Sequence, residues 1–235
     1  MKGDMEVKGE ILLENIPHEG KEIKFVYPSF RGPYGEVADA IEKARLKKPS
    51  SGELASLIDD AWKNSRGEYE SRLLDILTTG WLWEYSGNLY LPKSNEEIND
   101  GVIIEETPKI IDGKLSMDKN SLVERLRGND PLVKFVPFGY KIGFMTFREL
   151  LCNPYILARY GNEGAEKIVR ISSKYKSNPG LYSFSNVDKE KAVMSGFDNA
   201  LENNRLIIGG NVYNHISYGH CYGKKEDKAA DELKK

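Results

Sequence analysis

The stretch from Gly80 to Pro92, GWLWEYSGNLYLP, constrains the fold of this chain more than any other part of the sequence. It holds two of the three tryptophans, and no other stretch is so dense in large rings. Trp81, Trp83 and Tyr85 occupy every second position, which is the period of a β-strand. Because each buried ring removes about 150–250 Å² of surface from water, we expect a core to form on one face of this segment.

The middle of the same stretch predicts a β-hairpin. Ser86, Gly87 and Asn88 are residue types that tolerate the backbone conformations of a tight turn. Residues 89–91 would then form the return strand. The tryptophan stretch is therefore expected to fold as two short antiparallel strands.

The rest of the chain shows strands and helices in separate runs. Strands are predicted at residues 6–15, 21–27, 102–105, 110–117, 132–136, 140–144, 206–208 and 212–218, and helices around residues 37–44, 54–62, 69–77, 122–126, 150–160, 165–172 and 192–201. Strands grouped as hairpins, without regular βαβ alternation, are typical of an α+β fold. We therefore predict a largely antiparallel sheet built from hairpins, with groups of short helices packed on it.

Three local signals mark the ends of helices. Residues 50–53 (SSGE) and 146–149 (TFRE) have the capping-box pattern, in which a hydroxyl and a glutamate satisfy free backbone N–H groups. Pro154 interrupts the helical pattern of residues 150–160, so this region is expected to form two pieces. Asp188 is a candidate N-cap for the last predicted helix.

The length of 235 residues permits one large domain or two small ones. The polar residues 93–101 are the best place for a boundary. The strands on either side of them are too few to form two independent sheets, so we expect a single domain over residues 1–223. Residues 224–235 mix charges of both signs and are predicted to be a charged tail.

Bulk composition excludes several classes of protein. The formal net charge is −2, so no overall field would attract nucleic acid or an anionic membrane. Apolar runs are only a few residues long, whereas a membrane-spanning helix needs about 20. The two cysteines, Cys152 and Cys221, do not form a disulfide framework. We therefore expect a cytoplasmic protein with no membrane span.

Residues 213–223, YNHISYGHCYG, concentrate the residue types that could carry chemistry. Cys221 with His215 and His220 could form a thiolate and its base, or bind a soft metal. Strand alternation would place the two histidines on opposite faces unless Gly219 turns the chain. Because no recognised metal-ligand spacing is present, we predict no metal and no cofactor. A hydrolase or transferase that uses these three residues remains the alternative hypothesis.

A binding role is the first hypothesis. Aromatic side chains left outside the core could bind a protein partner or a small ligand, since amphipathic rings serve interfaces well. The ligand-binding candidates come from the two aromatic stretches and are Trp83, Glu84, Tyr85, Tyr213, Tyr218 and Tyr222.

A second alternative is nucleic-acid binding through the helix face at Lys167–Lys176. Lys167, Arg170 and Lys174 are spaced to lie on one side of a helix, where they could follow a phosphate backbone. Solvated helix faces commonly carry the same pattern. With a net charge of −2, we expect no specific binding of nucleic acid.

Overall fold

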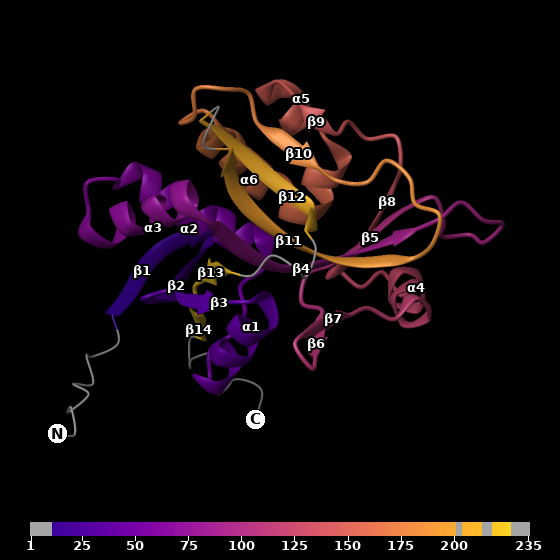
Figure 1. Cartoon of the computed structure of the whole chain (residues 1–235), viewed down its shortest axis with the longest axis horizontal. Helices are drawn as coiled ribbons and strands as arrows, with labels where there is room; N and C mark the ends of the chain where they lie inside the picture. The colour runs from indigo at the N-terminus through magenta and orange to yellow at the C-terminus, as the bar shows by residue number, and fades with distance from the viewer. Residues whose placement is uncertain (1–10, 201–203, 213–217, 227–235) are drawn as a thin grey trace.

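The computed structural model describes residues 11–200, 204–212 and 218–226 (Figure 1). Within these ranges the largest sheet has nine strands. Seven follow one another in the order β3 (Phe30–Gly32), β13 (Gly219–Cys221), β4 (Trp81–Leu91), β11 (Lys191–Ala200), β12 (Arg205–Val212), β10 (Gly180–Tyr182) and β9 (Gly143–Phe144). β5 (Gly101–Glu105) pairs with β4 and with β8 (Val133–Pro137).

Two smaller sheets accompany the large one. The first contains β1 (Ile11–His18), β2 (Lys21–Tyr27) and β14 (Lys224–Lys225), and the second is the hairpin of β6 (Lys109–Ile111) and β7 (Lys114–Ser116). The helices are α1 (Tyr34–Lys43), α2 (Ser51–Lys63), α3 (Glu68–Thr79), α4 (Lys119–Arg127), α5 (Phe147–Leu151) and α6 (Pro154–Ser172). This combination of mainly antiparallel sheets and helices confirms the predicted α+β class.

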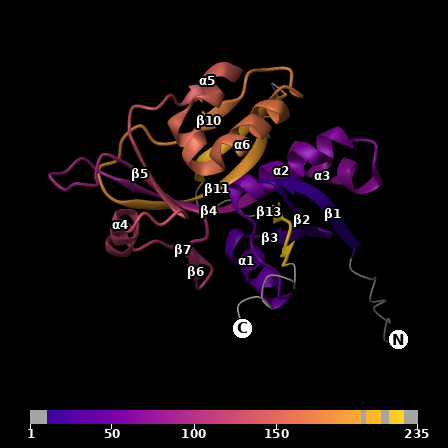
Figure 2. The same cartoon turned by 180° about the vertical axis from the view of Figure 1, so that it is seen from behind.

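Helices cover the two faces of the central strand β4. Trp83 packs edge-on against Tyr34 of α1, whereas the neighbouring Glu84 bonds to Arg159 of α6. Because successive strand residues point to opposite faces, α1 and α6 lie on opposite sides of the sheet. Figures 1 and 2 show α6 behind β10, β11 and β12 in one view and in front of them in the other. No helix of the described residues is long and apolar enough to cross a membrane.

The predicted hairpin within the tryptophan stretch is wrong, because β4 is a continuous strand of 11 residues. Gly87 sits where Met117 and Leu115 approach the backbone, and a Cβ there would lie 2.8 Å from the Met117 sulfur. Ser86 and Asn88 hydrogen-bond to Ser51, Ser195 and Tyr155 of other elements. Tertiary partners therefore stabilise an extended backbone where the local sequence favoured a turn.

The helix predicted after Asp188 is also wrong, because residues 191–200 form β11. Residues 193–197 are all buried, as expected for a strand with β4 on one side and β12 on the other. A short run of apolar residues buried on both faces has no strand periodicity, so a helix and a strand could not be distinguished from the pattern.

A third correction concerns the predicted hairpin of residues 132–136 and 140–144. The two strands do form, but β8 pairs with β5 and β9 pairs with β10. Other local signals are confirmed: β1 and β2 form the first hairpin, both capping boxes are present, and Pro154 begins a new helix capped by Asn153.

A row of polar side chains runs along the inner face of β4. Glu84, Ser86 and Asn88 have no exposed surface. Arg159 of α6, itself buried, donates from Nη2 to Glu84 Oε2 at 2.6 Å and from Nε to Ser51 Oγ at 3.1 Å. Buried charges of this kind are tolerated only when they are paired and hydrogen-bonded, so this row fixes how α2 and α6 sit on the sheet.

The buried ion pair allows a quantitative test. Arg159→Met and Glu84→Leu should each lower the free energy of unfolding by about 3–5 kcal/mol, because each leaves a buried charge without its partner. The double variant should recover much of that loss, and chemical denaturation measures all three. If the two losses simply add, the pair is not coupled in the way that the structure implies.

Candidate functional site

Four of the residues predicted to bind a ligand lie in the interior. Trp83, Tyr85, Tyr222 and Glu84 have no exposed surface. Trp83 Nε1 donates to the Gly32 carbonyl at 3.1 Å, and other buried partners hold Tyr85 and Glu84. In this structure these side chains are therefore enclosed by the core, where solvent does not reach them.

Tyr218 has a different environment. It is 62% exposed, and the Arg31 guanidinium lies 5.9 Å from its ring centroid. Tyr213 and His215 lie outside the described residues. Among the predicted ligand-binding residues that the structure describes, Tyr218 is thus the one with an exposed side chain.

The structure does not bring His220 and Cys221 together. They are neighbours in β13 and point to opposite faces. His220 is partly buried, and its Nδ1 lies 3.0 Å from Ser29 Oγ. Cys221 is fully buried, and burial raises the pKa of its thiol, which opposes formation of a nucleophilic thiolate. No group of three potential metal ligands occurs among the described residues.

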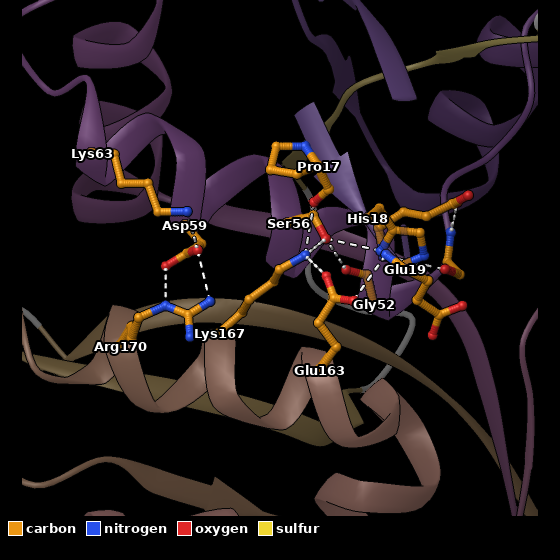
Figure 3. Close-up of polar contacts among 12 residues, drawn as sticks. Pro17, His18, Glu19, Gly52, Ser56, Asp59, Lys63, Glu163, Lys167 and Arg170 are labelled. Atoms are coloured by element: carbon orange, nitrogen blue, oxygen red, sulfur yellow. Dashed lines mark hydrogen bonds and ion pairs between the residues drawn. The ribbon is translucent and has the colours of Figure 1, made fainter. Parts of the chain in front are cut away.

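The basic helix face at Lys167–Lys176 is largely committed to contacts within the protein (Figure 3). Lys167 is buried and donates to Pro17 O and Ser56 Oγ, both at 2.8 Å, and to Glu163. Arg170 forms two 3.0 Å hydrogen bonds to the Asp59 carboxylate. The two cations therefore hold α6 against α2 and β1, and do not belong to a continuous basic surface.

Instead, exposed apolar side chains gather at the β9 edge of the large sheet. Four of the seven exposed large hydrophobic side chains among the described residues belong to β9, α5 and β10. They are Phe144, Phe147, Leu151 and Tyr182. Figure 1 shows these three elements side by side, and β9 pairs directly with β10.

The sheet register places two of these rings beside a tryptophan. Tyr182 pairs with Gly209, and the row continues through Gly196 to Trp83. Paired residues share a face of the sheet. Trp81 lies two residues before Trp83 on β4. Phe144 pairs with Gly180, which lies two residues before Tyr182 on β10. Because every second residue of a strand points to the same face, Trp81 and Phe144 share the face of this row. We call Phe144, Tyr182 and Trp81 the open aromatic face.

Glycines let the open aromatic face lie flat against the strands. A Cβ at Gly196 or Gly209 would come within 3.1 Å of the Trp81 ring, so the indole rests directly on two backbones. At the outer end, the Arg205 guanidinium lies 3.6 Å from the Phe144 ring centroid, and the Phe144 and Tyr182 rings meet edge to face. The result is a shallow surface of rings with a cation at its edge.

A second feature is a polar cleft beside the β1–β2 turn. Two adjoining hollows, of about 840 Å³ and about 330 Å³, share part of their walls. The residues common to both are His18, Glu19, Ser50, Glu106 and Leu132. Glu106 is half-buried, and its pKa is raised by burial and by the nearby charges of Glu53 and Glu19.

Hydrogen bonds fix the orientation of His18 in this cleft (Figure 3). Ser56 donates its hydroxyl hydrogen to the Gly52 carbonyl at 3.0 Å and accepts from the Lys167 ammonium. His18 Nδ1 lies 2.9 Å from the same hydroxyl oxygen. Because a serine hydroxyl has one hydrogen, Nδ1 must be the donor. The neutral ring then carries its lone pair on Nε2, which has no hydrogen-bond partner among the described residues.

Neither surface has a distinctive signal in the sequence. Phe144 and Tyr182 are isolated aromatic residues in ordinary stretches, and His18 is a single histidine in a turn. The capping box at residues 50–53 correctly located the start of α2 at the cleft. It could not show which distant residues would join it there.

The tautomer of His18 can be measured directly. Nitrogen-15 NMR of the imidazole at pH above 7 should show hydrogen on Nδ1 and a lone pair on Nε2. Ser56→Ala removes the acceptor, so the two tautomers should then become mixed. A wild-type spectrum with hydrogen on Nε2 would contradict the hydrogen-bond pattern in Figure 3.

Burial also lowers the pKa of His18 below its ordinary value of 6.5, although Glu53 and Glu19 act in the opposite direction. The imidazole of the unfolded chain then binds a proton more readily than that of the folded protein. The stability that the neutral ring contributes is therefore fully present above pH 6.5, and it is lost as the pH falls through the pKa of His18 in the folded state. Denaturation between pH 7.5 and about pH 5 should show a smaller loss of stability for His18→Gln than for the wild type. Equal pH dependence of the two proteins would refute this account.

No protein-family model matches this chain, and no curated protein matches it. A solved structure from work on how the C-type lectin fold accommodates massive sequence variation in Nanoarchaeota is similar, with a TM-score of 0.57 and 15% sequence identity. The similarity covers 84% of this chain and 98% of that one. A likeness at this identity concerns the fold, so the protein has a C-type lectin-like fold.

Proposed function

We propose that this chain is a binding protein that docks a protein partner on the open aromatic face. The observation that carries the proposal is the exposure of Phe144 (53%) and Tyr182 (45%) on neighbouring strands, beside the half-buried Trp81. A contiguous group of exposed rings is rare on a protein that has no partner. Aromatic residues are also the ones that most often carry binding energy at protein interfaces.

The shape of this surface favours a protein over a small ligand. Neither hollow of the polar cleft is lined by Phe144, Tyr182 or Trp81. Small ligands usually bind in concave pockets that enclose most of their surface, whereas rings lying flat on a sheet fit a partner that is itself broad. The expected partner presents apolar side chains to the rings.

The fold supports a binding role over an enzyme. The similar structure is described as accommodating massive sequence variation on the C-type lectin fold, and variation of that extent is carried most easily by surface residues outside a packed core. In this chain the buried polar residues of β4 hydrogen-bond to α2, α6 and β11. The exposed rings are free to serve recognition.

A matched set of variants tests the proposal. Phe144→Ser with Tyr182→Ser removes the outer rings, and Ile111→Ser removes an equally exposed apolar side chain (55%) from the distant β6–β7 hairpin. The wild type and both variants are used as baits in extracts of the source cells. An enriched partner is then purified, and its dissociation constant is measured against all three proteins.

The double variant should bind at least tenfold more weakly, which is about 1.4 kcal/mol, while the Ile111 variant should bind as the wild type does. Thermal melts check that all three proteins are folded. The proposal fails if the partner binds the double variant with wild-type affinity. It also fails if no protein is enriched on the wild type beyond what the double variant captures.

A further inference from the structure

The turn between β1 and β2 lies against the rest of the protein without any fully buried residue of its own. Glu19 and Gly20 form its tip, with φ angles of 47° and 73°. None of residues 17–22 is fully buried, whereas Ile16, just before the turn, is 2% exposed. Segments that bury few apolar side chains are the ones that open most easily in a folded protein. The turn can therefore separate from its neighbours without loss of the core.

Three hydrogen bonds join consecutive residues of this turn to α2 and α6 (Figure 3). They run from Lys167 Nζ to the Pro17 carbonyl at 2.8 Å, from His18 Nδ1 to Ser56 Oγ at 2.9 Å, and from the Glu19 backbone N–H to Glu163 Oε2 at 3.0 Å. Polar contacts to two helices thus hold the turn where apolar packing does not.

Lys167 connects the three contacts to one another. Its ammonium group is buried, with 4% of the residue exposed. Besides the Pro17 carbonyl, it donates to Ser56 Oγ at 2.8 Å and to Glu163. A buried cation is stable only while its partners are in place. The three hydrogen bonds of the turn therefore form and break together.

His18 is the member of this cluster whose charge changes near neutral pH. When its ring is protonated, an imidazolium and an ammonium both donate to the single Ser56 oxygen. The charged groups that act on the ring are Glu53 of α2, Glu19 of the turn itself, and Glu163 and Lys167 of α6. Burial is the largest influence, and it lowers the pKa of His18 although the three carboxylates act in the opposite direction. The protonated ring is therefore more stable where water reaches it.

Other charged residues line the smaller hollow together with His18. Glu106 is half-buried, Lys134 is exposed, and Arg159 is paired with Glu84. These side chains come from the segment after β5, from β8 and from the first part of α6. Both signs of charge are present among them, so they do not replace the contacts that His18 makes with Ser56.

We propose that the β1–β2 turn is an acid-sensitive latch, which opens as one local unit when His18 takes up a proton. Ser56, Lys167 and Glu163 form the fixed side of the latch. His18 and Glu19 line both hollows of the polar cleft, so opening removes part of the wall that the hollows share. The latch controls the shape of the cleft, and it does not rest on the proposed docking at the open aromatic face.

Hydrogen exchange of the backbone amides, measured by NMR on the full chain, tests the latch. The rates at residues 18, 19 and 21 are compared at pH 7.5 and at about pH 5. Each rate is divided by that of an unstructured peptide at the same pH, which gives a protection factor free of the intrinsic pH dependence. Protection should fall at least fivefold on acidification of the wild type, because the open turn holds the proton on His18 more tightly.

Two histidine variants identify the group that titrates. The side chain of His18→Gln still donates to Ser56 but does not titrate, so protection of the turn should be the same at both pH values. His220→Gln removes another partly buried imidazole, from β13, and should behave as the wild type does.

Urea separates local opening from unfolding of the whole protein. A local opening exposes little new surface, so protection of the turn should not change in up to about 1 M urea. Amides of β4 exchange through global unfolding and should lose protection steadily over the same range.

Two glutamate variants test the fixed side of the latch. Glu163→Ala removes the acceptor of the Glu19 N–H and a partner of Lys167, so protection of the turn should fall at least fivefold already at pH 7.5. Glu166→Ala removes the same charge from an exposed position on α6 and should leave protection unchanged.

Four results would each overturn the latch. These are equal protection of the wild-type turn at both pH values, an equal fall in His18→Gln and the wild type, the same urea dependence for the turn and β4, and equal effects of the two glutamate variants. None of these measurements involves the open aromatic face. The latch can therefore fail while the proposed docking of a partner stands, and the reverse also holds.

Discussion

The architecture depends on the buried contact between Arg159 and Glu84. Both side chains lack any exposed surface, so each is stable only where its partners are in place. Arg159 also donates to Tyr155 and to Ser51, and Tyr155 continues the network to Asn88 on β4. One guanidinium thus ties α2, α6 and the central strand together, and any slip in the register of β4 would leave several buried polar groups unpaired.

The same packing explains why Lys167 and Arg170 on the basic helix face contact other parts of the protein and do not form a continuous basic surface. Once α6 is held on β4 by Arg159, its next turns lie along α2, and Lys167 and Arg170 meet Ser56 and Asp59 there. A helical pattern in the sequence gives the side on which these residues lie, but not what covers that side. The nucleic-acid alternative therefore loses two of its principal cations to an internal interface.

The features that the sequence predicted correctly are those that depend on residues close together in the chain. The capping boxes, the helix start at Pro154 and the first hairpin depend on neighbouring residues, and all are present. The extended form of Ser86–Asn88 depends on α2, β5 and β11, so turn-forming residues misled the prediction there. The two candidate surfaces could not be predicted for the same reason. Exposure of Phe144 and the pairing of His18 with Ser56 are set by elements distant in sequence.

The break in α6 links the stability of the fold to the polar cleft. The first part of the helix aims Tyr155 and Arg159 at β4, and the second part aims Lys167 and Arg170 at α2 and β1. Gly161 sits between these two sets of contacts, with a positive φ that other residues rarely adopt. A break at Gly161 lets each part keep its own partners, and residues 157–161 at the break line the smaller hollow of the polar cleft. The smaller hollow therefore lies beside the point where the two parts of α6 meet, and that point is set by how the buried core is assembled.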